Sequence, residues 1–348
     1  MSRDADKDSD VAVPLPRETS ALFGHSEAER TLLDAFRSPR MPHAWLIGGP
    51  PGIGKATLAY RMARFALAHP DPASAAVQNA NNLFIAPNDP VFPRVASQGH
   101  SDMRVLERIE DDKGNLRKVI IVPQVARAVS FFGSTAGEGG WRLCIIDSVD
   151  ELNTEGANKI LKVLEEPPPR SIFLLVSHAP GRLLPTIRSR TRRLTLRSLA
   201  QADVIAAAAE ASGLAQDDAR LVAASAAAEG SVGRALALLD GSSLALRQQV
   251  TALLEQLPTV DPRALHSLGE RLGGSGSDPS PVIAFADVVR DWLSARLAAP
   301  SGPPARLAQV AEAWDKVNRA ARDVQDYNLE RKPLVFSVFG WLAETARR

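Results

Sequence analysis

Residues 48–57 read GGPPGIGKAT and contain most of a phosphate-binding loop. Such a loop runs G-x-x-x-x-G-K and then Ser or Thr; its backbone N–H groups surround phosphate oxygens, and its lysine reaches the β- and γ-phosphates. Gly49, Gly54 and Lys55 occupy the required positions, with Gly52 between them. A strand-like run precedes the loop and a helical pattern follows it, as an anion site at a helix N-terminus requires. The stretch predicts a site that can hold ATP.

The residue after the lysine departs from this pattern. Ala56 stands where a Ser or Thr hydroxyl normally holds Mg²⁺. Thr57 follows, but one step along a helix turns a side chain by about 100°. We therefore do not expect Thr57 to replace the missing hydroxyl cleanly.

A second candidate element, which is acidic, follows the apolar run LCII (143–146). Asp147 ends this run, at the position of the aspartate that holds Mg²⁺ in P-loop ATPases. The next residue is usually a glutamate that polarises the attacking water, but here it is Ser148, which cannot act as that base. We interpret Asp150 and Glu151 as solvated charges at the start of a helix. Together, Ala56 and Ser148 predict weak or absent hydrolysis.

A basic cluster lies in PTIRSRTRRLTLR (185–197), comprising Arg188, Arg190, Arg192, Arg193 and Arg197. It can be read as a solvated face or as a contact patch for DNA phosphates. A third reading offers one arginine to a neighbouring subunit's nucleotide, where it stabilises transition-state charge. The spacing alone leaves all three readings open.

Apolar runs indicate the strands that must position these residues. They cover 44–47, 142–147 and 171–177, and helical patterns such as 58–68 alternate with them. This alternation predicts an α/β domain with a mainly parallel sheet. In NTEGANKILKVLEEPPP (153–169), Asn153 or Thr154 can cap a helix that Pro167 ends.

Strand signals stop after residue 198. Three short helices punctuated by glycine are predicted over 201–213, 217–230 and 231–241, and longer amphipathic helices from 244 onward, with loops at 273–281 and 299–304. We therefore expect a disordered tail (1–15), an α/β nucleotide-binding-type domain (16–198), a small helical lid (199–243) and an all-α domain (244–348).

Composition narrows the class of protein. The 348 residues carry 41 basic and 40 acidic side chains, so net charge favours neither presence nor absence of nucleic-acid binding. Cys144 is the single cysteine, which excludes an internal disulfide and fits a cytoplasmic location. It lies in the middle of a predicted strand and is interpreted as a buried structural thiol. The six histidines show no metal-ligand spacing, so no metal site is predicted. No apolar stretch approaches the roughly 20 residues of a membrane span, and the polar start predicts neither a signal peptide nor an anchor.

Five stretches carry a resemblance to a known family: RMPHAWLIGGPPGIGKATLA, IIDSVDELNTEGANKILKVLEEPP, FLLVSHAP, IRSRTRRL and NLERKPLVFSVFGWLA. Together they resemble the clamp-loader branch of the AAA+ family, densely over 20–198 and more loosely to the C-terminus. The resemblance implies a RecA-like AAA+ P-loop domain, a helical lid and a helical collar domain for oligomerisation. It also implies a five-subunit ring with γ/τ and δ subunits of the bacterial DNA polymerase III clamp loader, which loads the sliding clamp on primed DNA in replication.

The resemblance also implies roles for particular residues. SRT (189–191) matches the family's Ser-Arg-Cys motif, so Arg190 is expected to complete a neighbour's ATP site in trans; Thr191 in place of cysteine leaves that role intact. Ser177 falls at the first sensor. Gly233 occupies the place of the second sensor's arginine, and Arg234 lies one position past it. The cysteine quartet of many relatives is absent, so no zinc module is expected.

Two hypotheses follow. In the first, the chain is a structural clamp-loader subunit that supplies Arg190 to its neighbour and hydrolyses little or no ATP itself. In the second, it is an active AAA+ ATPase, either a γ/τ-type motor or a related remodeller. Ala56, Ser148 and Gly233 favour the first, because each weakens hydrolysis in the chain's own site.

Overall fold

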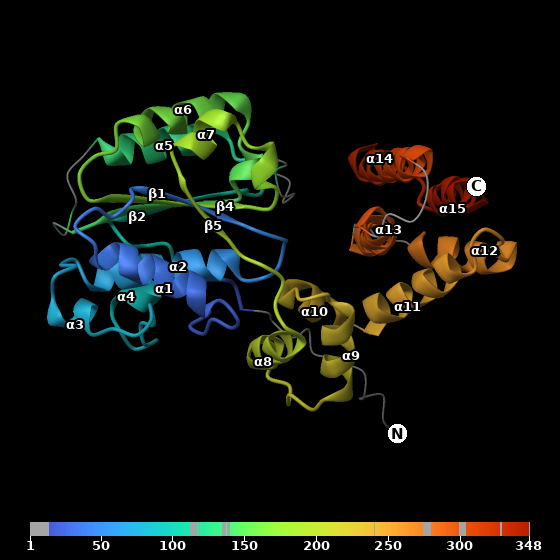
Figure 1. The fold of residues 1–348 in the computed structure, drawn as a ribbon, viewed down its shortest axis with the longest axis horizontal. Coiled ribbons are helices and arrows are strands. Elements are labelled where there is room, and N and C mark those ends of the chain that lie inside the picture. The colour runs from blue at the N-terminus through green and yellow to red at the C-terminus, as the bar shows by residue number, and fades with distance from the viewer. Residues whose placement is uncertain are drawn as a thin grey trace, which may run out of the picture. The chain divides into compact units, whose positions relative to one another are not determined.

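A computed structural model describes residues 14–111, 117, 119–133, 137, 140–239, 241–273, 280–298, 304–327 and 329–347. The chain forms two compact units, Met1–Leu236 and Ala237–Arg348 (Figure 1). The tail expected at 1–15 lies almost entirely outside the described residues. The expected boundaries at 198/199 and 243/244 stay a prediction.

A parallel sheet forms the centre of the first unit. Its strands are β1 (Ala44–Gly48), β2 (Met103–Glu107), β3 (Arg142–Asp147), β4 (Ser171–Ser177) and β5 (Arg192–Thr195). They lie in the order β2-β3-β4-β1-β5, and every neighbouring pair is parallel. β1 and β4 are buried at every position, as expected for strands covered on both faces. The predicted runs correspond to β1, β3 and β4, and the expected α/β fold class is confirmed.

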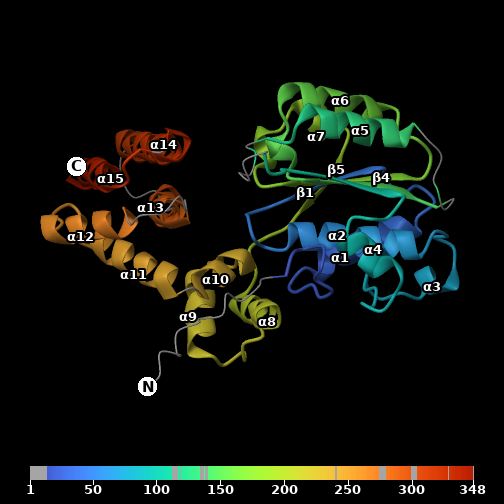
Figure 2. The ribbon, with the colours of Figure 1, turned by 180° about the vertical axis from the view of Figure 1, so that it is seen from behind.

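Helices cover both faces of this sheet (Figures 1 and 2). One face carries α1 (Ser26–Arg37), α2 (Lys55–Ala68), α3 (Ala75–Gln78) and α4 (Val91–Ala96). The other carries α5 (Val122–Phe132), α6 (Thr154–Glu165) and α7 (Pro185–Ser189). Two short 3₁₀ turns, η1 (Val149–Glu151) and η2 (Pro180–Arg182), follow the ends of β3 and β4. Each face has its own apolar core, so the sheet is held from both sides.

The caps of α6 fix where the helix starts and ends. The side chain of Asn153 accepts a hydrogen bond from the Gly156 N–H at 2.8 Å, so Asn153, rather than Thr154, is the N-cap. The helix ends before Pro167, as predicted. Ala157, Ile160 and Leu164 are buried, which attaches this face to the sheet.

Three short helices complete the first unit: α8 (Gln201–Ser212), α9 (Ala219–Ala227) and α10 (Val232–Leu239), whose end extends past Leu236. They match the three helices predicted from the sequence. Gly213 ends α8 with a left-handed conformation, φ +72°, which favours glycine.

The second unit consists of helices in its described residues. They are α11 (Gly241–Glu255), α12 (Pro262–Leu272), α13 (Ser280–Ala298), α14 (Pro304–Tyr327) and α15 (Lys332–Arg347). α13 packs on α11 and α14, and α15 packs on α12 and α14. Phe285, Val289 and Val335 are among the buried side chains of the core. The loops predicted at 273–281 and 299–304 fall mostly outside the described residues. No described helix is long and apolar enough to cross a membrane.

A buried ion pair joins α1 to α2. Glu29 on α1 accepts hydrogen bonds from the Nε and Nη2 of Arg61 on α2, at 2.9 and 2.6 Å. The same carboxylate accepts from the Leu83 N–H at 3.0 Å, and Arg61 also donates to the Ser20 carbonyl. Both charged side chains are almost fully buried. Each charge therefore depends on the other for compensation.

Arg64, one turn further along α2, holds the same N-terminal segment. It donates to the carbonyls of Arg17 and Thr19 at 3.0 and 2.7 Å, and its guanidinium lies 4.5 Å from the Phe92 ring centroid. Burial lowers the pKa of Arg64 to about 10. Two buried arginines of α2 therefore fix the chain over residues 17–20.

Glu29→Gln tests the buried pair. The variant leaves the Arg61 charge buried without a carboxylate, so we expect the free energy of unfolding of this unit to fall by about 3 kcal/mol. Native-state hydrogen exchange of the α2 amides measures it. Glu27→Gln on the same helix removes an exposed carboxylate and is the control, with an expected change within about 0.5 kcal/mol. Equal effects of the two changes would contradict this account.

Candidate functional site

The glycine-rich loop connects the end of β1 to the start of α2. Gly52 and Gly54 have φ values of +72° and +95°, a region that residues with a Cβ rarely adopt. α2 begins at Lys55, directly after Gly54. The loop N–H groups and the positive end of a 14-residue helix therefore meet at one place, as in anion sites.

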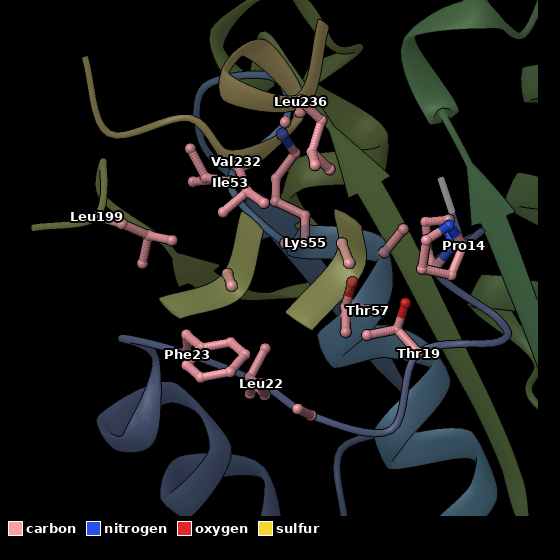
Figure 3. A pocket seen from close by; sticks show the side chains of 18 of the residues that line it. Pro14, Thr19, Leu22, Phe23, Ile53, Lys55, Thr57, Leu199, Val232 and Leu236 are labelled. Carbon is pink, nitrogen blue, oxygen red and sulfur yellow. The ribbon is translucent and has the colours of Figure 1, made fainter. Parts of the chain in front are cut away.

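A pocket of about 500 Å³ lies against this loop (Figure 3). Its walls come from residues 52–57, the segment 14–23, the ends of β3 and β4, and helices α8 and α10. The volume is in the range of small-molecule sites. Most of the predicted binding residues line it, namely Gly52, Gly54, Lys55, Ala56, Thr57 and Asp147. Gly49 belongs to the loop but does not line the pocket.

Lys55 supplies the positive charge of the pocket. Its side chain is buried, and its ammonium donates to the Pro50 carbonyl within the loop. Burial lowers the pKa of Lys55 to about 8, although the carboxylates of Asp147 and Asp150 act in the opposite direction. The ammonium is therefore mostly protonated at neutral pH. Its positive charge is only partly compensated by these carboxylates, and a bound phosphate would compensate it further.

Asp147 stands at the carboxyl end of β3, in register with Glu107 on β2. Burial raises the pKa of Asp147, and Glu107 raises it further, while Lys55 lowers it. Ala56 offers only a methyl group to the same pocket. Among the residues that the structure describes, no group of three or more His, Cys, Asp and Glu side chains could hold a metal. The loop N–H groups and Lys55 fit a phosphate chain, while Ala56 supplies no oxygen ligand for Mg²⁺.

Asp150 differs from its predicted role. One carboxylate oxygen accepts from Ser177 Oγ at 2.9 Å and the Ala179 N–H at 3.3 Å; the other accepts from Ser148 Oγ and the His178 N–H, both at 2.7 Å. Burial alone would raise the pKa of Asp150, but these four hydrogen bonds lower it below its ordinary value. The interpretation as a solvated charge was wrong, because η1 places this carboxylate at the end of β4.

The neighbouring acid, Glu151, also has a partner. Glu151 forms an ion pair with Arg108 at 2.9 Å, with 23% of the glutamate side chain exposed. Ser148 and Ser177 both direct their hydroxyls to Asp150. Spacing along the sequence did not reveal this network, because Asp150 and Ser177 are 27 residues apart.

The start of α10 packs directly on the phosphate-binding loop. The Gly233 N–H donates to the Gly52 carbonyl at 3.0 Å, and Ser231 Oγ donates to the Pro51 carbonyl at 3.0 Å. A Cβ on Gly233 would lie 3.1 Å from the Gly52 Cα, so a side chain here would be tightly crowded against the loop backbone. Arg234 pairs with Glu229 at 3.2 Å and does not line the pocket.

Arg190 lies outside this pocket, at the C-cap of α7. Its Nη2 contacts Glu165 Oε1 at 2.7 Å, and its Nη1 donates to the Thr186 carbonyl at 3.1 Å and to Ser189 Oγ at 3.3 Å. About a third of the side chain, 34%, is exposed. The structure thus brings Lys55 and Asp147 together and places Arg190 elsewhere on the same unit.

The other members of the basic cluster have different surroundings. The Arg192 guanidinium lies 5.0 Å from the Trp45 ring centroid, a cation–π contact. Arg193 and Arg197 are exposed. Cys144, in contrast, is buried within β3, and burial raises the pKa of its thiol to about 12, which confirms the structural reading.

Comparison with known proteins places this chain in a family. The family model described as "DNA polymerase III, delta subunit" matches residues 24–200, just over half of the chain. DNA polymerase III subunit delta' of Pseudomonas aeruginosa is 37% identical over 148 residues, 42% of this chain and 41% of that protein. Subunit delta' of Escherichia coli K12 is 27% identical over 66% of this chain and 64% of its own length. Subunit gamma/tau of Mycobacterium tuberculosis H37Rv is 27% identical over 76% of this chain and 47% of its own.

The chain therefore spans 41% to 64% of the length of these three relatives. The match to the family model runs from α1 through the loop, the β3 aspartate and the arginine cluster to the end of the sheet. On this evidence the chain belongs to the DNA polymerase III delta subunit family.

Proposed function

We propose that this chain is a delta'-type subunit of a bacterial clamp loader, which helps load the sliding clamp on primed DNA in replication. Its partners in this role are γ/τ-type and δ-type subunits in a five-membered ring. Family membership and similarity to delta' and gamma/tau subunits support the proposal. The observation that carries it is the position of Arg190, at the surface and outside the chain's own pocket.

The pocket at Lys55 is proposed to bind ATP without hydrolysing it efficiently. A bound nucleotide supplies a chain of phosphates, to which the loop N–H groups and the Lys55 ammonium are complementary. Ala56 lacks the hydroxyl that would hold Mg²⁺. The Ser148 hydroxyl is not a base, and it already donates to Asp150. At the second-sensor position, Gly233 has no side chain to offer the phosphates.

Arg190 is proposed to act on the ATP of a neighbouring subunit. Its guanidinium is exposed enough to meet a phosphate from outside the chain. In a dry interface such a cation stabilises the charge that develops during phosphoryl transfer, an effect worth about 10³–10⁵ in rate in other systems.

An active motor is the second candidate function. The intact loop with Lys55 favours it, as does the similarity to a gamma/tau subunit over 76% of this chain. The groups that would hold the metal and activate water do not favour it, because Ala56 and Ser148 stand at those positions. We therefore place nucleotide binding in this chain and hydrolysis in its neighbour.

Binding of ATP to the isolated chain should weaken as pH rises above about 8. Burial lowers the pKa of Lys55 to about 8. Below this pH the side chain is charged and can bind phosphate directly. Above it the neutral amine must first take up a proton, which weakens binding. We expect the affinity to fall by up to about tenfold per pH unit above 8. Fluorescence titration with an ATP analogue from pH 7 to 9.5, without Mg²⁺, measures this. Lys55→Arg stays charged throughout, so its affinity should not vary. A flat profile for the unaltered chain would contradict the assignment.

Arg190→Ala tests the trans role in the assembled complex. We expect ATP turnover in the presence of clamp and primed DNA to fall by at least about tenfold, because a neighbour loses its stabilising cation. The isolated variant should keep its fold, since the exposed Arg190–Glu165 pair stabilises by about 1 kcal/mol at most.

Arg193→Ala is the matched control, because it removes an exposed arginine of the same cluster. We expect its turnover to match the unaltered complex. If Arg193→Ala lowers turnover as much and weakens DNA binding in a salt-dependent way, the cluster contacts DNA instead. Unchanged turnover for Arg190→Ala would refute the trans role.

A further inference from the structure

Glu165 on α6 holds the guanidinium of Arg190. The Oε1–Nη2 distance of 2.7 Å is that of a close ion pair. The two residues come from different elements, the last residue of α6 and the C-cap of α7. These two helices pack on one another, so the packing of α6 on α7 holds both partners of the ion pair in place.

The position of Glu165 on its own helix is unfavourable. A carboxylate in the last turn meets the negative end of the helix dipole, which disfavours it. Glu165 and Glu166 both stand at this end of α6. Of the two, Glu165 is the one for which the structure shows an ion pair with a described residue. Its placement serves Arg190 and not the stability of α6.

The hydrogen bonds of Arg190 fix its guanidinium without using all its donors. Nη1 donates to the Thr186 carbonyl and to Ser189 Oγ, and Nη2 meets Glu165. A guanidinium has five N–H groups, and the hydrogen bonds to Thr186 and Ser189 use only Nη1, which leaves the N–H groups of Nε and Nη2 for a further acceptor. The arginine is thus held in one orientation before any partner arrives, which lowers the ordering entropy lost on assembly.

We propose that Glu165 is a positioning residue for Arg190: it fixes the guanidinium so that its remaining N–H groups meet a phosphate of the neighbouring subunit's nucleotide. The inference rests on the proposed trans role of Arg190. Glu165 also carries a negative charge that opposes the phosphate. The positioning role therefore requires that the gain in orientation of the guanidinium outweighs this repulsion.

Glu165→Ala in the reconstituted complex tests this role. We expect kcat for clamp- and DNA-dependent ATP hydrolysis to fall about five- to tenfold, since the misplacement of a catalytic group is costly. The KM for ATP should stay within about twofold, because Glu165 does not touch the neighbour's ground-state binding groups. The double variant Glu165→Ala/Arg190→Ala should be no slower than Arg190→Ala alone, since Glu165 acts through Arg190.

Glu166→Ala is the matched control, because it removes the same charge from the adjacent position. It should leave kcat unchanged, and isolated Glu165→Ala should melt like the unaltered chain. Unchanged or raised turnover for Glu165→Ala overturns the proposal, as does an equal loss in the Arg190→Ala background. If Arg190→Ala itself leaves turnover unchanged, the proposed function fails together with this inference. If Arg190→Ala lowers turnover but Glu165→Ala does not, the positioning role of Glu165 fails and the trans role of Arg190 stands.

Discussion

The pairing of β1 between β4 and β5 is the constraint on which the site depends. Because the strands are parallel, their carboxyl ends meet at one edge of the sheet. In this register Gly48 lies beside both Ser177 and Thr195, and the Gly48 carbonyl accepts from the Leu196 N–H at 2.8 Å. The phosphate-binding loop therefore starts next to Ser177. β3 adds Asp147 at the same edge, beside β4.

This edge carries the groups that we propose bind phosphate, and it lacks a glutamate at position 148. Lys55 and the glycine backbone remain, while Ser148 and Ser177 are tied to Asp150 in a network that serves the structure. The lid adds to this fixed arrangement, because Gly233 lets α10 rest directly on Gly52. The pocket at Lys55 and the ion pair of Arg190 with Glu165 therefore lie at separate places on the same unit.

The sequence predicted the elements whose signal is local. β1, β3 and β4 are continuous apolar runs because both faces of the sheet are covered, and Asn153 marks the start of α6 by its own side chain. β2 and β5 were not singled out: both lie at the edges of the sheet and mix exposed charged residues with apolar ones. Edge strands give a weaker pattern for this reason.

Contacts between residues that are far apart in the sequence were not predicted. The carboxylate of Asp150 was assigned to solvent, since its partners Ser177 and His178 lie on another strand end. Gly233 was read as a lost arginine, and the structure adds the reason for a glycine: it contacts Gly52, far away in sequence. The partner of Arg190 is likewise set by the packing of α6 on α7, which no local pattern encodes.

We propose that this chain binds ATP but does not hydrolyse it efficiently. Steady-state ATP turnover by the isolated chain, alone and with clamp and primed DNA, is the measurement that decides this. We expect measurable binding of ATP together with a turnover no faster than that of Lys55→Ala. Turnover at about 1 s⁻¹ or faster, as in ordinary enzymes, that disappears in Lys55→Ala would contradict it.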